Sequence, residues 1–594
     1  MKKTYLILFL ISLSTYSQPF NYQRSWATYF GDDSIKITSS DIDGNGNLFL
    51  VGFIDRQHFA VNDSNFTTTP FSYQPTYGGG ISDGIIVKIS PDGTVLWSTF
   101  FGGENTDLIT ALKIDSNNNL CILGSTSSIQ NIATAGAYQT STMGNSSFLT
   151  KFSNDGILLW STYYDNYLDP NLQLPFNSSG SYLLYNDAYF DIDLSNNIYF
   201  DIRTRNEGLA TSNAFQTTRN QPTGGDLISK FSPTGQRIWA TYYGTNGSLI
   251  YGLCLGTDGM YISGTSLDCV PTYSANTYFA TSGCHQPTPG SCKDIFLSKF
   301  SLDGNRIWST YYGNNGFEWI YDKSIVATAD SVYLTGTTFR QTGITTSGSF
   351  QENINAINQQ NAFLAKFNSD GTRQWGTFYG FAGTLSSNSK VTKDSNGAVF
   401  LSGITDFTQN IASAGSYQEI KNDGYDTFVA KFSPNGDRQW GNYYGGNGFE
   451  RENSKILVYN NSFYIVGSTD STENIATIGS FQPNYAVNNF QTTGASNFYI
   501  AKFEPLPLST KKNNENPFSI YPNPNNGRFV ITFKNKLIEN YTLDIYDTMG
   551  KKITTQNLNS SQTVIETNNL SKGLYIVKIT NPEHISFNTK IIVE

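Results

Sequence analysis

Acidic residues follow the tryptophan-containing segments of this 594-residue chain at several places, and they are the first candidates for chemistry. Two carboxyl groups that flank a glycosidic bond can hydrolyse it when they are held a suitable distance apart. Spacing along the chain does not fix that distance. The acids therefore make a carbohydrate-active enzyme one hypothesis, with no catalytic residue assigned. They are Asp32, Asp33, Asp107, Glu318 and Glu450.

The histidines and a calcium-loop-like segment give little support for a catalytic or metal-binding site. The three histidines, His58, His285 and His584, lie far apart in the chain, which argues against a histidine-based triad or a histidine-rich metal site. The segment DIDGNGN (41–47) places oxygen-bearing side chains at alternate positions, as calcium loops do. However, Gly52 stands where the bidentate glutamate is required. We therefore expect a hairpin turn there, and we assign no metal, cofactor or catalytic residue.

The five cysteines fall into two groups. Cys121 and Cys254 lie in strand-like runs and are expected to be buried as small apolar residues. Cys269, Cys284 and Cys292 crowd one loop, where we expect one disulfide and favour Cys284–Cys292 over a bond to Cys269. A metal site that also used the histidine after Cys284 is the alternative, but its spacing matches no zinc pattern.

The segments around these residues repeat seven times. Seven tryptophans recur every 63 to 79 residues. Each unit also has a strand-like run ending in Gly, an aromatic–Gln pair and a run ending in Lys; the third unit is the longest and has Ile202 at the Gly position. Four short β-runs per unit are typical of propeller blades. The units start near residues 26, 97, 160, 239, 308, 375 and 440.

The two ends of the repeat region complete each other. Elsewhere the Lys run and the Trp run form one hairpin, joined by turns such as SPDG or SPNG. The first unit begins at Trp26 with no Lys run before it, and the last ends with Lys502 and no Trp run after it. If these two halves pair, the ring closes and no sheet edge stays exposed. We therefore predict an all-β fold with a closed seven-bladed β-propeller.

The repeated lysines allow two interpretations. They could line an anion-binding ring. Their alternation with Leu or Ile favours instead lysines whose stems are buried and whose ammonium groups reach a partner. The set is Lys88, Lys151, Lys230, Lys299, Lys366, Lys431 and Lys502.

The chain ends add export signals and a second domain. Residues 1–17 have two lysines, a short apolar run and small residues before a cut, as secretory signal peptides do. The propeller is expected over 18–503, a Pro/Asn/Lys linker over 504–516, and alternating strands that predict a small Ig-like β-sandwich over 517–594. No later apolar stretch reaches transmembrane length.

Two resemblances extend this picture. The WSTYYGG-like, NxYxxGxT-like and FxxKF-like elements of residues 26–503 resemble the bacterial seven-bladed propeller repeat family known by the SBBP label. That family implies a fold and an export habit but no shared reaction. The tail resembles the C-terminal sorting domain of the type IX (Por) secretion system of Bacteroidetes, which implies export to the cell surface or medium and usual cleavage of the domain. The residues that carry this second resemblance are Tyr521, Pro522, Asn523, Pro524, Gly527, Gly550, Gly573 and Tyr575.

The net charge and the composition exclude one class of binding partner. The net charge is −9 and no long basic stretch occurs, so nucleic acid is not an expected partner.

Two functions remain as hypotheses. The first is a secreted or surface-displayed binding scaffold whose Tyr-, Asn- and Trp-rich loops contact glycan or protein. The alternative is an extracellular glycoside hydrolase or lyase that uses paired carboxylates at one mouth of the ring. The third unit and the cysteine loop of the fourth are where a specialised surface is expected.

Overall fold

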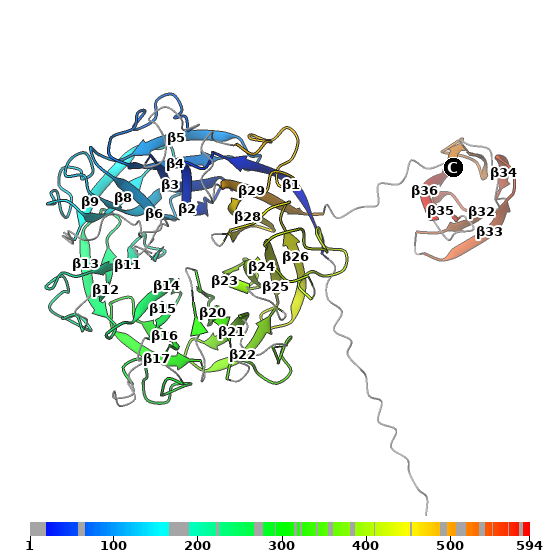
Figure 1. Cartoon of the computed structure of the whole chain (residues 1–594). Coiled ribbons are helices and arrows are strands. Elements are labelled where there is room, and N and C mark those ends of the chain that lie inside the picture. Colours follow the sequence, from blue (N-terminus) through cyan, green and yellow to red (C-terminus); the bar gives the residue numbers. More distant parts are fainter. Residues whose placement is uncertain are drawn as a thin grey trace, which may run out of the picture. The chain divides into compact units, whose positions relative to one another are not determined.

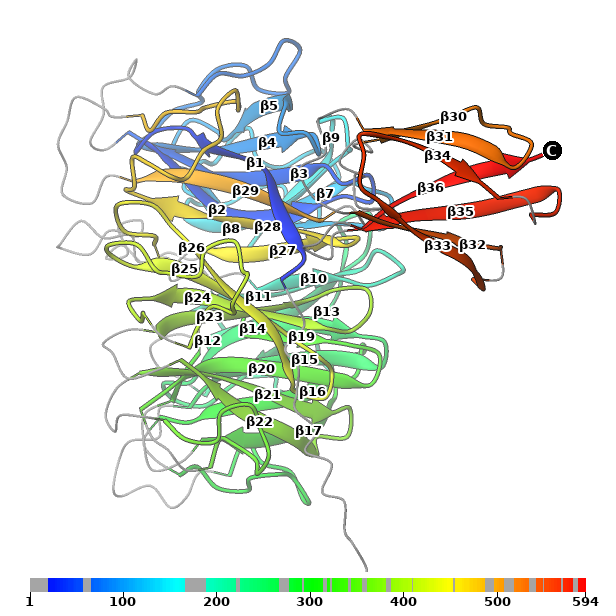
Figure 2. The same cartoon turned by 90° about the vertical axis from the view of Figure 1, so that its right-hand side faces the viewer.

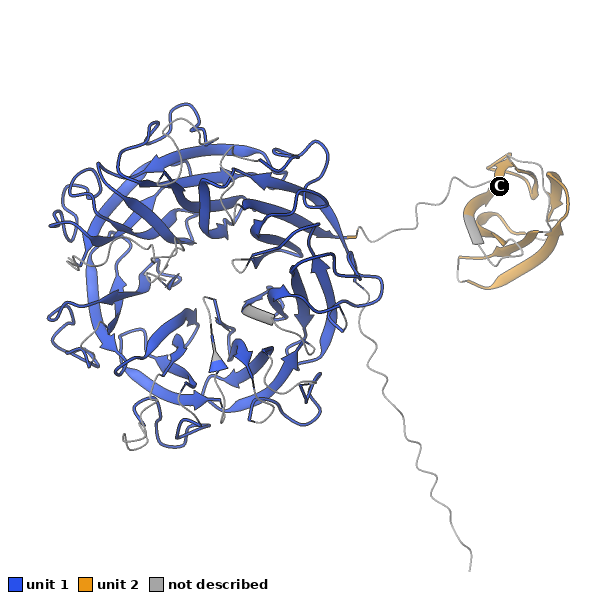
Figure 3. Cartoon of the chain, viewed as in Figure 1, with its two compact units in different colours: residues 1–505 blue, residues 506–594 orange. Residues whose placement is uncertain are grey.

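Every regular element among the described residues of the computed structural model is a β-strand. The chain divides into two compact units, residues 1–505 and 506–594 (Figure 3). The expected signal peptide (1–17) and most of the expected linker lie outside the described residues. The structure describes residues 20–56, 66–165, 189–220, 225–266, 277–290, 293–313, 318–320, 323–339, 343–354, 360–380, 386–408, 410–451, 454–486, 496–506, 518–533, 541–548, 550–567, 570–580 and 586–594.

The first unit contains seven antiparallel sheets arranged as the blades of a propeller (Figure 1). Blade 1 consists of β2 (Ile35–Ile42), β3 (Leu48–Asp55), β4 (Ser82–Ile89) and β5 (Val95–Phe101). Blade 2 consists of β6 (Asp107–Ile114), β7 (Leu120–Thr126), β8 (Ser146–Phe152) and β9 (Leu158–Tyr164). Blade 3 consists of β10 (Phe190–Ile192), β11 (Ile198–Thr204), β12 (Gly225–Phe231) and β13 (Arg237–Tyr243).

The remaining blades follow the same order from the ring centre outwards. Blade 4 consists of β14 (Leu249–Gly256), β15 (Gly259–Thr265), β16 (Ile295–Phe300) and β17 (Arg306–Tyr312). Blade 5 consists of β18 (Glu318–Trp319), β19 (Ile325–Ala327), β20 (Ser331–Thr338), β21 (Asn361–Asn368) and β22 (Arg373–Tyr379). Blade 6 consists of β23 (Ser386–Lys393), β24 (Val399–Thr405), β25 (Asp426–Phe432) and β26 (Arg438–Tyr444). Blade 7 consists of β27 (Lys455–Tyr459), β28 (Ser462–Thr469), β29 (Asn497–Pro505) and β1 (Tyr22–Phe30).

Blade 7 joins the two ends of the repeat region. β1 pairs antiparallel with β29 (Figure 1). Trp26 lies opposite Lys502, as the equivalent residues do in every complete hairpin. Elsewhere the equivalent Lys–Trp pair belongs to one continuous hairpin, for example Lys431 opposite Trp440. The pairing predicted between the two ends is therefore confirmed, and with it a closed ring of seven blades.

The hairpin tryptophans join each blade to the next. Six indole N–H groups donate to a turn carbonyl of the following blade at 2.9–3.1 Å. The turn glycine of that blade lies over the indole: Gly436 has φ +91°, and a Cβ there would lie 2.9 Å from Trp375 Cδ2. Trp440 differs because the hairpin of blade 7 is split. It packs edge-to-face against Phe20 instead, with ring centroids 5.0 Å apart.

The hairpin lysines also act between blades. Five share the turn carbonyl that the tryptophan uses; Lys88 Nζ, for example, donates to Asn154 O at 3.1 Å. Lys151 and Lys431 instead form ion pairs of 2.7 and 2.9 Å with Asp115 and Asp394. Six of the seven ammonium groups lie over an aromatic ring, which adds cation–π attraction. The paired interpretation is confirmed, and these lysines form no anion-binding ring.

The second unit is a small sandwich of two antiparallel sheets (Figure 2). One sheet contains β30 (Phe518–Tyr521), β31 (Arg528–Phe533) and β34 (Gln562–Glu566). The other contains β32 (Tyr541–Tyr546), β33 (Lys552–Leu558), β35 (Gly573–Thr580) and β36 (Ser586–Val593). The inner faces share one apolar core that includes Phe529, Ile545 and Val577. The predicted fold class, a seven-bladed β-propeller followed by a small Ig-like sandwich, is thus confirmed.

Candidate functional site

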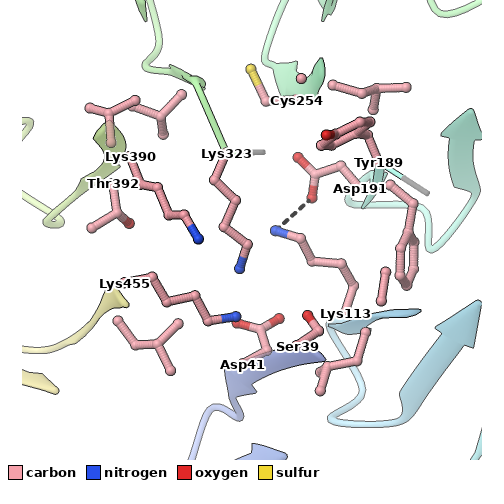
Figure 4. Close-up of a pocket in the computed structure, with 18 of the residues that line it drawn as sticks. Ser39, Asp41, Lys113, Tyr189, Asp191, Cys254, Lys323, Lys390, Thr392 and Lys455 are labelled. Carbon is pink, nitrogen blue, oxygen red and sulfur yellow. Dashed lines mark ion pairs between the residues drawn. The ribbon is translucent and has the colours of Figure 1, made fainter. Parts of the chain in front are cut away.

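The first strands of the seven blades surround a cavity of about 810 Å³ at the centre of the ring (Figure 4). Its size falls in the range of pockets that hold small organic ligands. The lining includes six lysines against two aspartates, and no arginine lines the cavity among the described residues. The six, called the channel lysines below, are Lys36, Lys113, Lys323, Lys390, Lys393 and Lys455.

The positive excess in the cavity is opposite to the charge of the whole protein, which is −9. Like charges gathered in a concave wall raise the local potential, because the low-dielectric surroundings focus the field. The cavity is therefore suited to an anion. Figure 4 shows Lys113, Lys323, Lys390 and Lys455 extending into the same central space.

Two of these lysines replace small residues of other blades. Lys390 of β23 and Lys455 of β27 lie opposite the residue that precedes the second-strand glycine. At the same register position the first strands of blades 1, 2 and 4 carry Ser39, Ala111 and Gly252. Lys390 and Lys455 thus extend into the cavity from a position where the short side chains of blades 1, 2 and 4 leave space.

The backbone at Lys323 adds a second unusual feature. Lys323 precedes β19 and has φ +56°, in the left-handed region that residues other than glycine seldom occupy. Strain of this kind persists where the surrounding structure over-determines it, and it gathers at functional sites. Here it accompanies a lysine that lines the cavity.

The two aspartates of the wall flank Lys113. Lys113 Nζ lies 3.4 Å from Asp191 Oδ1, and the Asp191 carboxylate raises the pKa of Lys113 above its usual value. Both aspartates also connect neighbouring blades: Asp41 Oδ2 accepts from Ile114 N at 3.1 Å, and Asp191 Oδ2 accepts from Leu255 N at 2.9 Å. These bonds fix the carboxylates at the cavity wall.

Lys36, Lys393 and Lys455 are held by neighbouring groups. Lys455 Nζ donates to Ser40 O at 3.2 Å, and Lys393 Nζ donates to the carbonyl oxygen of Ala327. Burial lowers the pKa of Lys36, and the nearby carboxylates of Asp55, Asp33 and Asp32 oppose that shift. Asp32 and Asp33, two of the acids considered from the sequence, are therefore buried neighbours of a channel lysine rather than members of an acid pair.

The other acids considered from the sequence do form pairs, but between blades. Asp107 meets Asp83 of blade 1, and Glu450 meets Asp426 of blade 6; these are called the acid pairs below. In the first, a Cβ added at Gly102 would lie 2.6 Å from Asp83 Oδ1 and 2.8 Å from Asp107 Oδ2. In the second, the Glu450 carboxyl hydrogen-bonds that of Asp426.

Glu318 lies close to Asp294 of blade 4 in the same way. A Cβ at Gly313 would lie 2.8 Å from Glu318 Oε2 and 3.2 Å from Asp294 Oδ1. This position corresponds to that of the glycine between the members of each acid pair. The arrangement therefore recurs at three blade junctions.

In each acid pair one oxygen per carboxyl is well satisfied and the other is not. Asp107 Oδ2 accepts from Gly103 N at 2.7 Å and Ser128 Oγ at 2.9 Å, and Glu450 Oε1 accepts from Thr469 Oγ1 at 2.7 Å. The remaining oxygens, including Asp83 Oδ1 and Glu450 Oε2, accept from no other donor among the described residues, so a proton shared between the two carboxyl groups is what can satisfy them. Burial raises the pKa of Asp83 and of Glu450 to about 8 and that of Asp107 to about 6. Each pair can therefore share a proton at neutral pH.

The acid pairs are not placed for catalysis on a sugar. Asp83, Asp107, Asp426 and Glu450 are each 0 % exposed, and none of them lines the cavity. A catalytic carboxyl has to reach its substrate. The pairs instead hold the start of one blade against the next.

The remaining candidates from the sequence have structural surroundings. The turn at 43–47 is held by Asp43, whose Oδ1 accepts from Asn45 N and Asn47 N at 2.9 Å, so the hairpin-turn interpretation is confirmed. His285 packs against Tyr312 and Phe367 as the aromatic member of its aromatic–Gln pair. No cluster of metal-ligating side chains occurs within the described part of the chain.

The cysteines agree in part with expectation. Cys121 and Cys254 are buried free thiols, as expected from their strand-like runs. Cys284 is half-buried and forms no disulfide with another described cysteine, while Cys269 and Cys292 lie outside the described residues. The Cys284–Cys292 disulfide stays a prediction.

Sequence reasoning missed the channel lysines, although a signal for them exists. Lys390 and Lys455 both follow an Asn-Ser pair, in NSKV and NSKI, at positions where other units carry Ser, Ala or Gly. The repeat is recognised from the second strand, the loop and the Lys–Trp hairpin of each unit, and none of these contains a channel lysine. Alignment of the first strands would have shown two lysines as departures from the repeat.

The comparisons with known proteins identify the second unit. Residues 519–594 match the family described as a secretion system C-terminal sorting domain. The tail is a sorting domain. It contains every residue singled out for that resemblance, and the sandwich described above is its fold. Within the described residues, no helix is long and apolar enough to cross a membrane.

The propeller has more distant likenesses. An uncharacterized WD repeat-containing protein of Acanthamoeba polyphaga mimivirus is 25% identical over 333 residues, which cover 48% of this chain and 23% of that protein. The chain thus spans about a quarter of the length of this curated relative. Among solved structures, polysaccharide lyase Uly1 aligns with TM-score 0.37 and 8% identity, over 79% of this chain and 90% of the lyase. The endosialidase of phage phi92 aligns with TM-score 0.33 and 10% identity, over 97% of this chain and 87% of the endosialidase.

Proposed function

We propose that this chain is an exported binding protein whose propeller holds an anionic ligand in the central cavity. The observation that carries the proposal is the excess of six lysines over two aspartates in the wall of a cavity of about 810 Å³, in a protein of net charge −9. Ammonium groups gathered in one concave, low-dielectric wall repel one another, and a bound anion would offset that repulsion.

Export is supported by the sorting domain. A match to the secretion-system sorting family over residues 519–594 fits delivery through the type IX machinery to the cell surface or the medium, followed by removal of the domain. The signal-like residues 1–17 fit passage across a first membrane. The seven-fold hairpin pattern fits an SBBP-type repeat protein of the Bacteroidetes.

Binding is favoured over hydrolysis by where the carboxyl groups lie. The acid pairs are buried between blades, and the two cavity aspartates each accept a backbone N–H of the neighbouring blade. The carbohydrate-active enzyme considered from the sequence therefore receives no support from these acids. The lysines support an anion-binding cavity instead.

The proposal is tested by titrating the full chain, expressed without residues 1–17, with anionic oligosaccharides and inorganic anions in a calorimeter at low and at physiological salt. We expect binding that Lys390→Met weakens at least tenfold, because a charge-assisted hydrogen bond contributes about 1.5–3 kcal/mol. Methionine keeps the length and apolar stem of lysine, so the wall stays packed. Lys366→Met removes the same charge at a hairpin lysine outside the cavity and should leave the affinity unchanged.

Equal affinities for the Lys390→Met variant and the unaltered protein would contradict the proposal. Failure of every anion in the panel to bind would also contradict it. Thermal unfolding of each variant shows whether a loss of binding comes from a loss of folding.

A further inference from the structure

The cavity is asymmetric, and the asymmetry points to a class of ligand. Lys323, Lys390 and Lys455 come from three consecutive blades, 5 to 7, and extend into the same central space (Figure 4). Asp41, Lys113 and Asp191 come from blades 1 to 3. The three lysines of blades 5 to 7 are called the cationic side below, although Lys455 Nζ also reaches blade 1, where it donates to Ser40 O at 3.2 Å. Across blades 1 to 3, two carboxylates flank one ammonium group.

The cationic side consists of lysines alone. Arginine has a planar fork that matches a carboxylate through two parallel hydrogen bonds, whereas lysine is a compact charge with three rotatable donors. Three such groups directed at one space suit an oxyanion that accepts from several directions. A tetrahedral sulfate or phosphate group meets this requirement better than a planar carboxylate does.

The opposite side offers acceptors. In Asp41 and Asp191 each carboxylate oxygen accepts one backbone N–H, one oxygen from the next blade and the other from the following residue, while an ionised carboxylate has about four acceptor sites in all. Their remaining sites can accept from hydroxyl groups. Ser39 and Thr392 line the cavity too and add hydroxyls that can donate or accept. Such a surface suits a polyhydroxylated molecule.

The room for such a molecule lies in front of the lysines. Ala111 and Gly252 occupy the register position that Lys390 and Lys455 occupy in their blades. Short side chains there leave the centre of the cavity to a ligand. A volume of about 810 Å³ is enough for a small molecule and far below that of a folded partner.

We propose that the cavity binds the sulfate or phosphate ester of a small polyhydroxylated molecule, such as a sugar. The oxyanion lies among Lys323, Lys390 and Lys455, and the hydroxyl groups donate to Asp41 and Asp191. This inference rests on the proposed function, since it names the ligand class for the same cavity.

The experiment compares five probes on the full chain by calorimetry: inorganic sulfate, inorganic phosphate, glucose 6-sulfate, glucose 6-phosphate and glucuronate. We expect the two esters to bind at least tenfold more tightly than glucuronate and more tightly than the inorganic ions. The preference between sulfate and phosphate esters identifies which source of tetrahedral oxyanion the cavity takes.

Two variants separate the two halves of the site. Lys323→Met should weaken the esters and the inorganic ions alike, by about tenfold. Asp191→Asn should lower the affinity for the glucose esters relative to that for the inorganic ions, because an amide has fewer acceptor sites for hydroxyl groups than a carboxylate. Release of Lys113 from its ion pair favours all four anions alike and cancels in this ratio. Lys366→Met is the control for charge outside the cavity.

The failures are distinguishable. If no probe binds, both the inference and the proposed function are wrong. If glucuronate binds as tightly as the esters, and Lys323→Met and Lys390→Met weaken it, the cavity binds anions but the tetrahedral preference is wrong. If Asp191→Asn leaves the ratio of ester to inorganic-ion affinity unchanged, the assignment of the hydroxyl side is wrong.

Discussion

At the scale of single residues, the repeated hairpin shows how conspicuous residues can be structural. The indole N–H of Trp375 donates to Pro434 O at 3.1 Å, and Gly436 of the same turn lies over the indole ring. The turn thus gives the preceding blade a carbonyl acceptor for the indole N–H and a glycine that packs against the face of the indole ring. Glycine is needed there for two separate reasons, the positive φ and the proximity of the ring.

Alanine substitutions can separate those two reasons. Gly436→Ala should lower the free energy of unfolding by about 2–3 kcal/mol, because left-handed strain costs about 1–2 kcal/mol and the Cβ also meets Trp375. Gly397→Ala is the matched control: its φ is +79°, and nothing lies within 4 Å of the added Cβ. It should lose about 1 kcal/mol in urea unfolding. Equal losses for the two variants would show that the contact with the indole contributes nothing.

At the scale of elements, the junction between blades depends on how the third strand of one blade meets the first strand of the next. Asp83 and Asp426 stand five residues before a hairpin lysine. Blades 5 and 7 carry Asn361 and Asn497 at that place, and an amide N–H can donate there without a proton being bound. The acids of blades 1 and 6 need a shared proton to make the same kind of contact.

The shared protons predict a pH dependence of stability. The pKa of Asp83 is raised by burial from 3.8 to about 8, so the folded protein keeps a proton that the unfolded chain releases near pH 4. The contribution is complete below the unfolded pKa and is lost as the pH rises through about 8. We therefore expect the free energy of unfolding to fall between pH 6 and pH 9, by about 1–3 kcal/mol.

Asp83→Asn should reduce that fall, because the amide replaces the shared proton at every pH. Asp303→Asn alters an exposed turn aspartate and should leave the pH profile unchanged. Urea unfolding at several pH values measures both. A profile that is equally steep in Asp83→Asn would contradict proton sharing at this junction.

The hairpins and the first strands differ in how far the sequence predicts them. Each hairpin carries its own turn signal, an alternating strand and a Trp–Lys pair, so local propensity and packing agree. The first strands are short, and several contain a bulge, as at Thr38 and Thr110, where the register shifts by one residue. A bulge breaks the two-residue alternation that shows which side chains face the cavity. The sequence alone therefore did not place the channel lysines.

At the scale of the whole propeller, the ring is closed by hydrogen bonds between strands from opposite ends of the repeat region. The orphan halves of one hairpin made this closure predictable, since an open array would expose two edges. The cavity was not predictable in the same way. The set of charged side chains in the cavity depends on which first strands face one another across the ring. The number and order of the blades determine those neighbours.

Removal of β1 should open the ring. A chain that lacks residues 18–30 exposes the edge of β29 and loses the bond from Trp26 to Pro91 O. We expect aggregation in gel filtration and a melting temperature lower by several degrees. A chain that lacks residues 506–594 keeps all strands of blade 7 and should stay monomeric. A monomeric protein of unchanged melting temperature without β1 would contradict the role assigned to the seam.

The seam also sets the order of assembly. Ser25 and Lys502, which form a hydrogen bond across it, are 477 residues apart. Entropy of loop closure grows only with the logarithm of that separation, so the distance takes little from final stability. Its effect is on timing: blades 1 to 6 contain only local hairpins, whereas blade 7 is complete only when both ends have met. Until β29 has paired with β1 the ring is open, and the cavity takes its final shape only once these two strands have met.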